Sequence, residues 1–277
     1  MLFSVIIINY KTPQLTENCL DGLFALGEKN SFWPNDLEVI VIDNNSGDGS
    51  VEGLQAKYGK KIKLIANQKN LGFAGANNQG AAIAQGDFLF FLNSDTIISA
   101  DVLSDCLQLF RQDESLGIVS PHLLLPDGSY QQAAFGNFPK LKKLIFKRQQ
   151  KNLEPKPDSG YLAVDWVSGC ALMIKREAFA ALKGWDKQFF LYFEDIDLCR
   201  RAWQQQYRVA VCLSTSLVHL GGQSLAPSLA KRRVYYRSQD YYFRKHHGRT
   251  QAALLKILRL PYIIFLFCQE KIRNFSL

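Results

Sequence analysis

The first half of the chain alternates short apolar runs with longer amphipathic segments. Strands are expected where the runs are apolar and short, at 3–8, 37–42, 63–66 and 88–92. Helices are expected between these runs, at 13–26, at 51–58 and in the segment that follows Gly72. Strands that alternate with helices predict a doubly wound, mostly parallel α/β sheet covered by helices on both faces.

The second half of the chain is less regular. A strand is expected at 166–174, with an interruption at Ser168 and Gly169, and a helix at 194–206. The stretch 140–151 mixes basic with apolar residues, a pattern that fits a basic amphipathic helix and also a loop. The pattern does not separate these two structures.

Polar side chains follow several expected strands at the point where each strand ends. The carboxyl ends of parallel strands share one rim of the sheet, and ligands bind along that rim. Asp95 ends the run 88–92, where a carboxylate suits a divalent cation beside phosphates, or else caps the next helix. Asp43 ends the second strand, where it suits a ribose or base, or else closes a turn.

Two further segments carry candidate chemistry. Glu194 and Asp195 open the helix at 194–206 after an apolar approach, so their carboxylates are expected in a partly desolvated place suited to a general base. The alternative is an ordinary acidic helix start that complements the helix dipole. His219 ends an apolar run before two glycines, which suits a metal ligand, although a lone histidine is more often structural.

Charge is distributed unevenly along the chain. Residues 1–138 carry 8 Lys and Arg against 15 Asp and Glu, whereas residues 139–277 carry 25 against 10. The basic half therefore favours an anionic partner such as phosphates or a membrane surface. Nucleic acid is not expected, because this half has no evident recognition helix or aromatic stacking ladder.

Cysteine usage and the N-terminal segment bear on the compartment. The six cysteines are scattered without a Cys-x-x-Cys pair, so they predict neither a zinc site nor a disulfide framework. The apolar start, residues 2–8, is too short for a signal peptide. We expect a cytoplasmic protein.

Two common nucleotide-binding classes are disfavoured by their missing motifs. The first strand is not followed by Gly-x-Gly-x-x-Gly, and no Gly-x-x-x-x-Gly-Lys-[Ser/Thr] occurs. A dinucleotide dehydrogenase and a P-loop enzyme are therefore not expected.

Several segments, in this order, resemble the inverting glycosyltransferases of family 2, which have the GT-A fold. They are Ser4 to Tyr10, Val41 to Ser46, Asn70 to Ala74, Asn93-Ser94-Asp95, Gly184-Trp185-Asp186, Phe193-Glu194-Asp195 and His219. The rhamnosyltransferase-like branch of bacterial polysaccharide synthesis is the most similar, since it shares Asn-x-Asp in place of Asp-x-Asp. The resemblance implies one GT-A domain at 1–250, with a nucleotide-sugar half at 1–125 and an acceptor half at 126–250, and an amphipathic helical tail at 251–277.

The resemblance also implies a role for each matched position. Asp195 is expected as the catalytic base, with Glu194 beside it, and Asp95 and His219 as ligands of Mg²⁺ or Mn²⁺. The expected nucleotide-sugar contacts are Tyr10, Asp43, Asn70, Asn78, Asn93 and Ser94. Expected phosphate contacts are Lys231 and Arg232, and expected acceptor contacts are Ser168, Gly169 and Trp185. Asn93 stands where relatives often have a second acid, so the metal is expected to bind weakly without the nucleotide.

The implied reaction is transfer of a sugar from dTDP-rhamnose or a UDP-hexose to a glycan or lipid-linked acceptor. Two alternatives remain at this point, a sugar nucleotidyltransferase and a non-catalytic nucleotide-sugar or glycan-binding module. The tail, apolar but interrupted by Lys256, Arg259 and Pro261, is too short to span a membrane and fits an interfacial helix or a core helix. An interfacial helix implies peripheral contact with the inner face of the cytoplasmic membrane.

Overall fold

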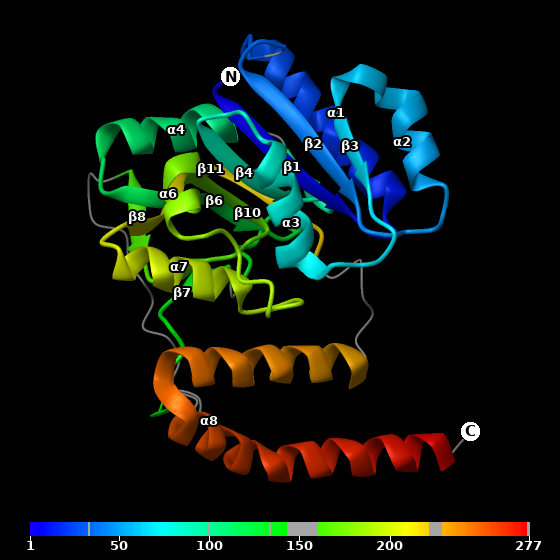
Figure 1. Ribbon diagram of the computed structural model, residues 1–277, viewed down its shortest axis with the longest axis vertical. Coiled ribbons are helices and arrows are strands. Elements are labelled where there is room, and N and C mark those ends of the chain that lie inside the picture. The colour runs from blue at the N-terminus through cyan, green and yellow to red at the C-terminus, as the bar shows by residue number, and fades with distance from the viewer. Residues whose placement is uncertain (33, 99, 133, 143–159, 222–228, 276–277) are drawn as a thin grey trace.

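The computed structural model describes residues 1–32, 34–98, 100–132, 134–142, 160–221 and 229–275, with side chains described as far as residue 263. An α/β domain forms most of the molecule, and a long helical hairpin lies along one end of it (Figure 1). Most of the basic stretch 140–151 falls outside the described residues.

The domain is built on one large sheet with a smaller two-stranded sheet beside it. Its strands are β1 (Phe3–Asn9), β2 (Leu37–Asp43), β3 (Lys63–Ala66), β4 (Phe88–Asn93), β5 (Thr96–Ile97), β6 (Leu116–Leu124), β7 (Phe135–Gly136), β8 (Tyr161–Val164), β9 (Trp166–Val167), β10 (Ala171–Lys175) and β11 (Arg208–His219). The order in the large sheet is β3-β2-β1-β4-β10-β6-β11-β5, with β8 on β11. β1 pairs in parallel with β2 and β4, whereas β10 runs antiparallel between β4 and β6.

Helices cover both faces of the large sheet. They are α1 (Pro13–Lys29), α2 (Ser50–Tyr58), η1 (Gly59–Lys61), α3 (Gly72–Ile83), α4 (Val102–Gln112), α6 (Arg176–Ala181) and α7 (Glu194–Gln204), whereas α8 (Leu229–Phe275) forms the hairpin at the end of the domain. Alternate residues of β1 enter different cores: Val5 and Ile7 pack with α1, α2 and α4, and Ile6 packs with α3, α6 and α7. Apolar side chains on both faces explain why strands such as β4 are uninterrupted apolar runs.

These elements confirm the expected fold class. The bounds of β3 agree with the sequence-based expectation, and the interruption at Ser168 and Gly169 divides the expected strand into β9 and β10. The mostly parallel order also confirms that β1, β2 and β4 end on one rim.

Helix α8 reverses direction once and forms the hairpin. Gly248 has φ 87° and ψ 169°, a conformation that is essentially restricted to glycine. We call residues 229–247 the inner arm and residues 249–275 the outer arm. The inner arm lies between the α/β domain and the outer arm (Figure 1).

Candidate active site

A cleft of about 830 Å³ lies at the carboxyl end of the parallel strands and extends to α7 and the inner arm of α8. Most of the site residues expected from the sequence line this cleft: Tyr10, Asn70, Asn93, Ser94, Asp95, Ser168, Gly169, Glu194, Asp195, His219 and Lys231. Residues from both halves of the chain thus face one cavity.

Strand pairing brings Asp95 and His219 together. Asp95 lies between β4 and β5, and His219 pairs with Thr96 where β5 runs antiparallel to β11. The Leu220 N–H donates to the Asp95 carbonyl at 2.9 Å, which fixes the two backbones. As a result His219 Nε2 lies 3.2 Å from Asp95 Oδ1, and both side chains are largely buried.

This pair fits a divalent metal ion. His219 Nδ1 lies 2.8 Å from Gln131 Oε1, so a proton donated to Gln131 leaves the Nε2 lone pair facing the carboxylate. A carboxylate oxygen and a ring nitrogen 3.2 Å apart are close enough to bind one divalent ion together. Among the described residues no cluster of three His, Cys, Asp or Glu side chains forms here. Asp95 and His219 are thus the two side chains of these types that the described residues bring together here.

Asp195 lies across the cleft at the first turn of α7. Its Oδ2 accepts from the Gly169 N–H at 3.1 Å, and its Oδ1 accepts from the Ile196 N–H at 2.8 Å. Burial raises the pKa of Asp195, and the two N–H donors oppose that rise. A fixed carboxylate with a raised pKa is suited to accept a proton near neutral pH.

Glu194 shares this environment but is more deeply enclosed. Burial, and then the charge of Asp195, raise the pKa of Glu194 well above its usual range. Its Oε2 has no hydrogen-bond partner among the described residues. The neutral form of Glu194 is favoured beside the Asp195 carboxylate, because two adjacent buried charges are costly.

A strained segment carries the acids into the cleft. Tyr192 and Phe193 both have positive φ, 70° and 67°, which is uncommon for aromatic residues and costs about 1–3 kcal/mol each. The Phe73 N–H donates to the Phe190 carbonyl at 2.9 Å and ties this segment to α3. Gly72 has φ +71°, and a Cβ there would overlap the Phe190 carbonyl.

The variant Gly72→Ala should therefore displace the segment that positions Asp195. We expect the protein to lose about 1–3 kcal/mol of stability from backbone strain and overlap, and turnover to fall further than stability alone explains. The matched control is Gly53→Ala in α2, where an added Cβ meets nothing within 4 Å. Urea unfolding and turnover of both variants check this, and equal behaviour of the two would contradict it.

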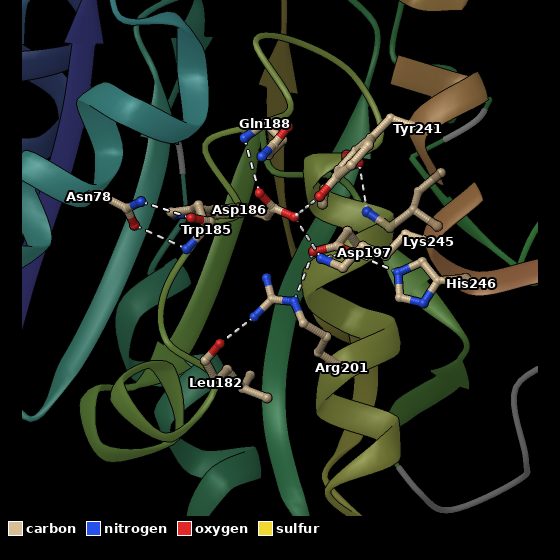
Figure 2. A network of polar contacts seen from close by, with 12 residues as sticks. Asn78, Leu182, Trp185, Asp186, Gln188, Asp197, Arg201, Tyr241, Lys245 and His246 are labelled. Carbon is tan, nitrogen blue, oxygen red and sulfur yellow. Dashed lines mark hydrogen bonds and ion pairs between the residues drawn. The ribbon is translucent and has the colours of Figure 1, made fainter. Parts of the chain in front are cut away.

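The first turn of α7 is anchored by Asp197. This fully buried carboxylate accepts from Arg201 Nε at 2.8 Å, and from Lys245 Nζ and His246 Nε2 at 2.7 Å each (Figure 2). Lys245 also reaches Asp186 at 2.7 Å. Asp197 therefore joins the helix that carries Asp195 to the inner arm of α8.

Replacement of this carboxylate should be costly. For Asp197→Asn we expect a loss of about 3–5 kcal/mol, because Arg201 and Lys245 lose their buried partner. Burial alone would raise the pKa of Asp197, but His246, Arg201 and Lys245 outweigh it and hold that pKa below its usual range. The stability that the ionised Asp197 carboxylate contributes is present above about pH 3.9, the usual pKa of an aspartate. It is lost as the pH falls through the lowered pKa of Asp197.

Thermal unfolding of the wild type and of Asp197→Asn between pH 3 and 7 measures this contribution. Asp36→Asn, an exposed acid, serves as the control and should stay within about 0.5 kcal/mol of the wild type. A similar melting temperature for the Asp197 and Asp36 variants at pH 7 would refute the anchoring role.

Four expected site residues do not line the cleft. The Asn78 side chain donates to the Trp185 carbonyl at 2.8 Å and accepts from the Trp185 N–H at 3.0 Å (Figure 2). Trp185 is 1% exposed and packs against Phe91 in the core. These positions correct the expected sugar contact of Asn78 and the expected acceptor contact of Trp185, because both residues hold the fold.

The other two residues are Asp43 and Arg232. Asp43 is 2% exposed and accepts from Asn9 Nδ2 at 2.7 Å and from the Ser46 N–H at 3.0 Å, as the turn alternative predicts. Arg232 lines a different cavity, between the two arms of α8. The expected phosphate contact of Arg232 in the cleft is corrected accordingly.

Other residues of the cleft were not expected from the sequence. Gln131 follows β6, and Tyr235 and Gln239 lie on the inner arm of α8. Nothing in the local pattern distinguishes Gln131 from a turn residue, because its partner His219 lies 88 positions away. The repeat of Lys231, Tyr235 and Gln239 at intervals of four would have indicated one face of a helix.

Comparison with known proteins assigns the class of this fold and site. The model of glycosyl transferase family 2 matches residues 4–181, most of the described domain, and the chain belongs to this family. The N-acetylglucosaminyl-diphospho-decaprenol L-rhamnosyltransferase of Mycobacterium tuberculosis is 25% identical over 92% of this chain and 88% of its own. The low-salt glycan biosynthesis hexosyltransferase Agl10 of Haloferax volcanii is 24% identical over 97% and 85%.

Solved structures show the same GT-A fold. The mannosyltransferase PcManGT from Pyrobaculum calidifontis, in complex with GDP-Man and Mn²⁺, aligns with a TM-score of 0.63 at 18% identity over 89% of this chain and 64% of its own. GalNAc-T7 with UDP, GalNAc and Mn²⁺ aligns with a TM-score of 0.61 at 14% identity over 99% and 58%. The chain is a glycosyltransferase, and this class takes precedence over the nucleotidyltransferase and the non-catalytic module.

Proposed function

We propose that the protein transfers a sugar, with inversion, from a nucleoside-diphosphate sugar to a hydroxyl of a glycan or lipid-linked acceptor in cell-surface polysaccharide assembly. The observation that carries this proposal is one cleft with a metal-suited pair, Asp95 and His219, on one side and a half-buried carboxylate, Asp195, on the other. A dTDP-rhamnose or UDP-hexose donor is supported by the similarity to the rhamnosyltransferase and the hexosyltransferase.

Asp195 accepts the proton of the acceptor hydroxyl while that oxygen bonds to the anomeric carbon. The bond from the anomeric carbon to the diphosphate breaks on the opposite face, and the nucleoside diphosphate leaves. Gly169 and Ile196 hold the Asp195 carboxylate through their N–H groups, and Ser168 borders the acceptor side. Glu194, kept neutral by burial, leaves the negative charge on Asp195.

The donor lies along the rim of the parallel strands. Tyr10 and Asn70 line the part of the cleft beside β1 and α3 and contact the nucleotide, with Asn93 and Ser94 near the sugar. Asp95 and His219 would hold Mg²⁺ or Mn²⁺, which when bound would neutralise charge on the diphosphate. Lys231 provides a further cation on the inner arm of α8.

A screen of nucleotide sugars with Mg²⁺ and with Mn²⁺ tests this function. We expect dTDP- or UDP-sugars to bind and to be hydrolysed slowly without an acceptor, and only with the metal present. If none of the dTDP-, UDP- or GDP-sugars binds under either condition, the proposed function is wrong.

We also propose that the outer arm of α8 rests on a membrane surface, at the inner face of the cytoplasmic membrane. No helix in the described part of the chain is long and apolar enough to span a bilayer. The outer arm nevertheless exposes a row of large apolar side chains, Leu254, Ile257, Leu258 and Tyr262. Their spacing at three and four residues sets them on one helical face, as in an interfacial helix.

A further inference from the structure

A second cavity, of about 700 Å³, lies between the two arms of α8. Its lining is strongly basic: Arg232, Arg233, Arg237, Arg244, Arg249 and Lys256. Among the described residues that line it, Asp240 is the one acid, and Asp240 already bonds Arg259 Nη2 at 2.7 Å. The cavity therefore carries a large excess of positive charge.

The reversal at Gly248 builds this cavity from two helical faces. On the inner arm, Arg233, Arg237 and Arg244 recur at intervals of four and seven, which places them on one face. On the outer arm, Arg249 and Lys256 recur at an interval of seven and face them across the cavity. The ion pair of Arg259 with Asp240 joins the arms, so Arg259 packs inside the hairpin.

The chemistry of the lining selects a phosphate. Clustered cations repel one another unless an anion lies between them, and guanidinium groups bond phosphate oxygens in pairs. The one lining acid among the described residues, Asp240, is held by Arg259 at 2.7 Å and by Lys256 at 3.7 Å, so it does not pair with Arg237, Arg244 or Arg249. A phosphate ester is the ligand that best matches several guanidinium groups in one cavity.

The surroundings of the cavity indicate where this phosphate comes from. The outer arm that forms one wall also carries the exposed apolar row, in which Ile257 is 66% exposed and Tyr262 is 49% exposed. The row lies on the face of the outer arm opposite the cavity, because none of its side chains lines the cavity. With the row among the acyl chains of a bilayer, the arginines would lie at the level of the headgroup phosphates. A free phosphate would need no such apolar row.

We propose that the basic cavity between the arms of α8 binds the phosphate of an anionic phospholipid. This inference deepens the membrane contact proposed above and rests on it. The inner arm also lines the catalytic cleft through Lys231, Tyr235 and Gln239. The lipid site is thus separated from the cleft by a single helix, about 10 Å across, and would orient the cleft toward the membrane.

The test is co-sedimentation of the full chain with two kinds of vesicle. One is phosphatidylcholine alone, and the other contains about 30% phosphatidylglycerol, which gives the surface a negative charge. The test variant is Arg237→Gln/Arg244→Gln. The control, Arg111→Gln/Arg176→Gln, removes the same charge from exposed positions of α4 and α6. We expect the wild type and the control to prefer anionic vesicles. The test variant should partition onto them about 30-fold less than the wild type, because each of its two lost charges contributes about fivefold.

Each other outcome has a defined meaning. Equal partitioning of the test variant and the control overturns the site. A wild type that binds both vesicle types equally leaves the membrane contact standing but overturns the lipid site. A wild type that binds neither type of vesicle overturns both the membrane contact and the lipid site. Weaker binding of Ile257→Gln/Leu258→Gln to anionic vesicles would support the contact of the outer arm with the membrane.

The glycosyltransferase function is assessed separately in the same variants. Hydrolysis of the nucleotide sugar in solution should be unchanged in Arg237→Gln/Arg244→Gln, because neither arginine lines the catalytic cleft. Parallel loss of hydrolysis and vesicle binding would instead mean that the double variant disturbs the fold, and would overturn an independent lipid site.

Discussion

Asp195→Asn should lower kcat/KM by about 10²–10⁴-fold, the range of a lost general base. The asparagine amide retains the shape of the side chain, but its single oxygen accepts from only one of the Gly169 and Ile196 N–H groups, and the amide cannot take the acceptor proton. The metal pair lies across the cleft and is untouched, so the nucleotide should bind as in the wild type. The effect should therefore fall on turnover and not on donor binding.

Kinetics and calorimetric titration with the nucleotide separate these two effects. Glu177→Gln, an exposed acid in the first turn of α6, is the control and should retain full activity. Because burial raises the pKa of Asp195, the acid limb of the wild-type rate should lie above the usual range of an aspartate. An Asp195→Asn enzyme with more than about a tenth of wild-type turnover would rule out this base.

Asp95→Asn should lower kcat/KM by at least about 10²-fold, because a divalent ion contributes several kcal/mol at a diphosphate. Asp95 is the charged member of the metal-suited pair, since its neighbour His219 would bind an ion through a neutral ring nitrogen. Without that charge, Mn²⁺ should no longer be retained with the nucleotide.

The spectrum of free Mn²⁺ in electron paramagnetic resonance measures this directly. The wild type should bind Mn²⁺ weakly alone and more tightly with a nucleoside diphosphate, whereas Asp95→Asn should show no such gain. Asn93→Asp adds a second acid at the same site and should tighten Mn²⁺ binding in the absence of nucleotide. Equal Mn²⁺ binding by the wild type and Asp95→Asn in the presence of nucleotide would exclude Asp95 as a ligand.

Local pattern predicted the elements better than the contacts between them. The run 88–92 predicts β4, because a parallel strand that is buried on both faces is a continuous run of apolar residues. The strand is found at Phe88–Asn93. Asp95 and His219 were each identified from a position at the end of an apolar run. Their separation of 3.2 Å depends on the pairing of β5 with β11, which no local pattern encodes.

The corrections depend on features that local sequence does not reveal. Asn78 resembles a polar cleft residue by position, but its partner Trp185 lies 107 positions away. Arg232 directly follows Lys231, yet neighbours on a helix point in directions about 100° apart, so they enter different cavities. Side-chain direction on a long helix is set by its packing, and here that packing depends on the reversal at Gly248.

The anomeric configuration of the product tests the central claim most directly. One carboxylate, Asp195, that deprotonates the acceptor predicts a single displacement with inversion. With the donor identified by the nucleotide-sugar screen, proton NMR of the first product formed should show the configuration opposite to that of the donor. A product that retains the donor configuration would contradict this account.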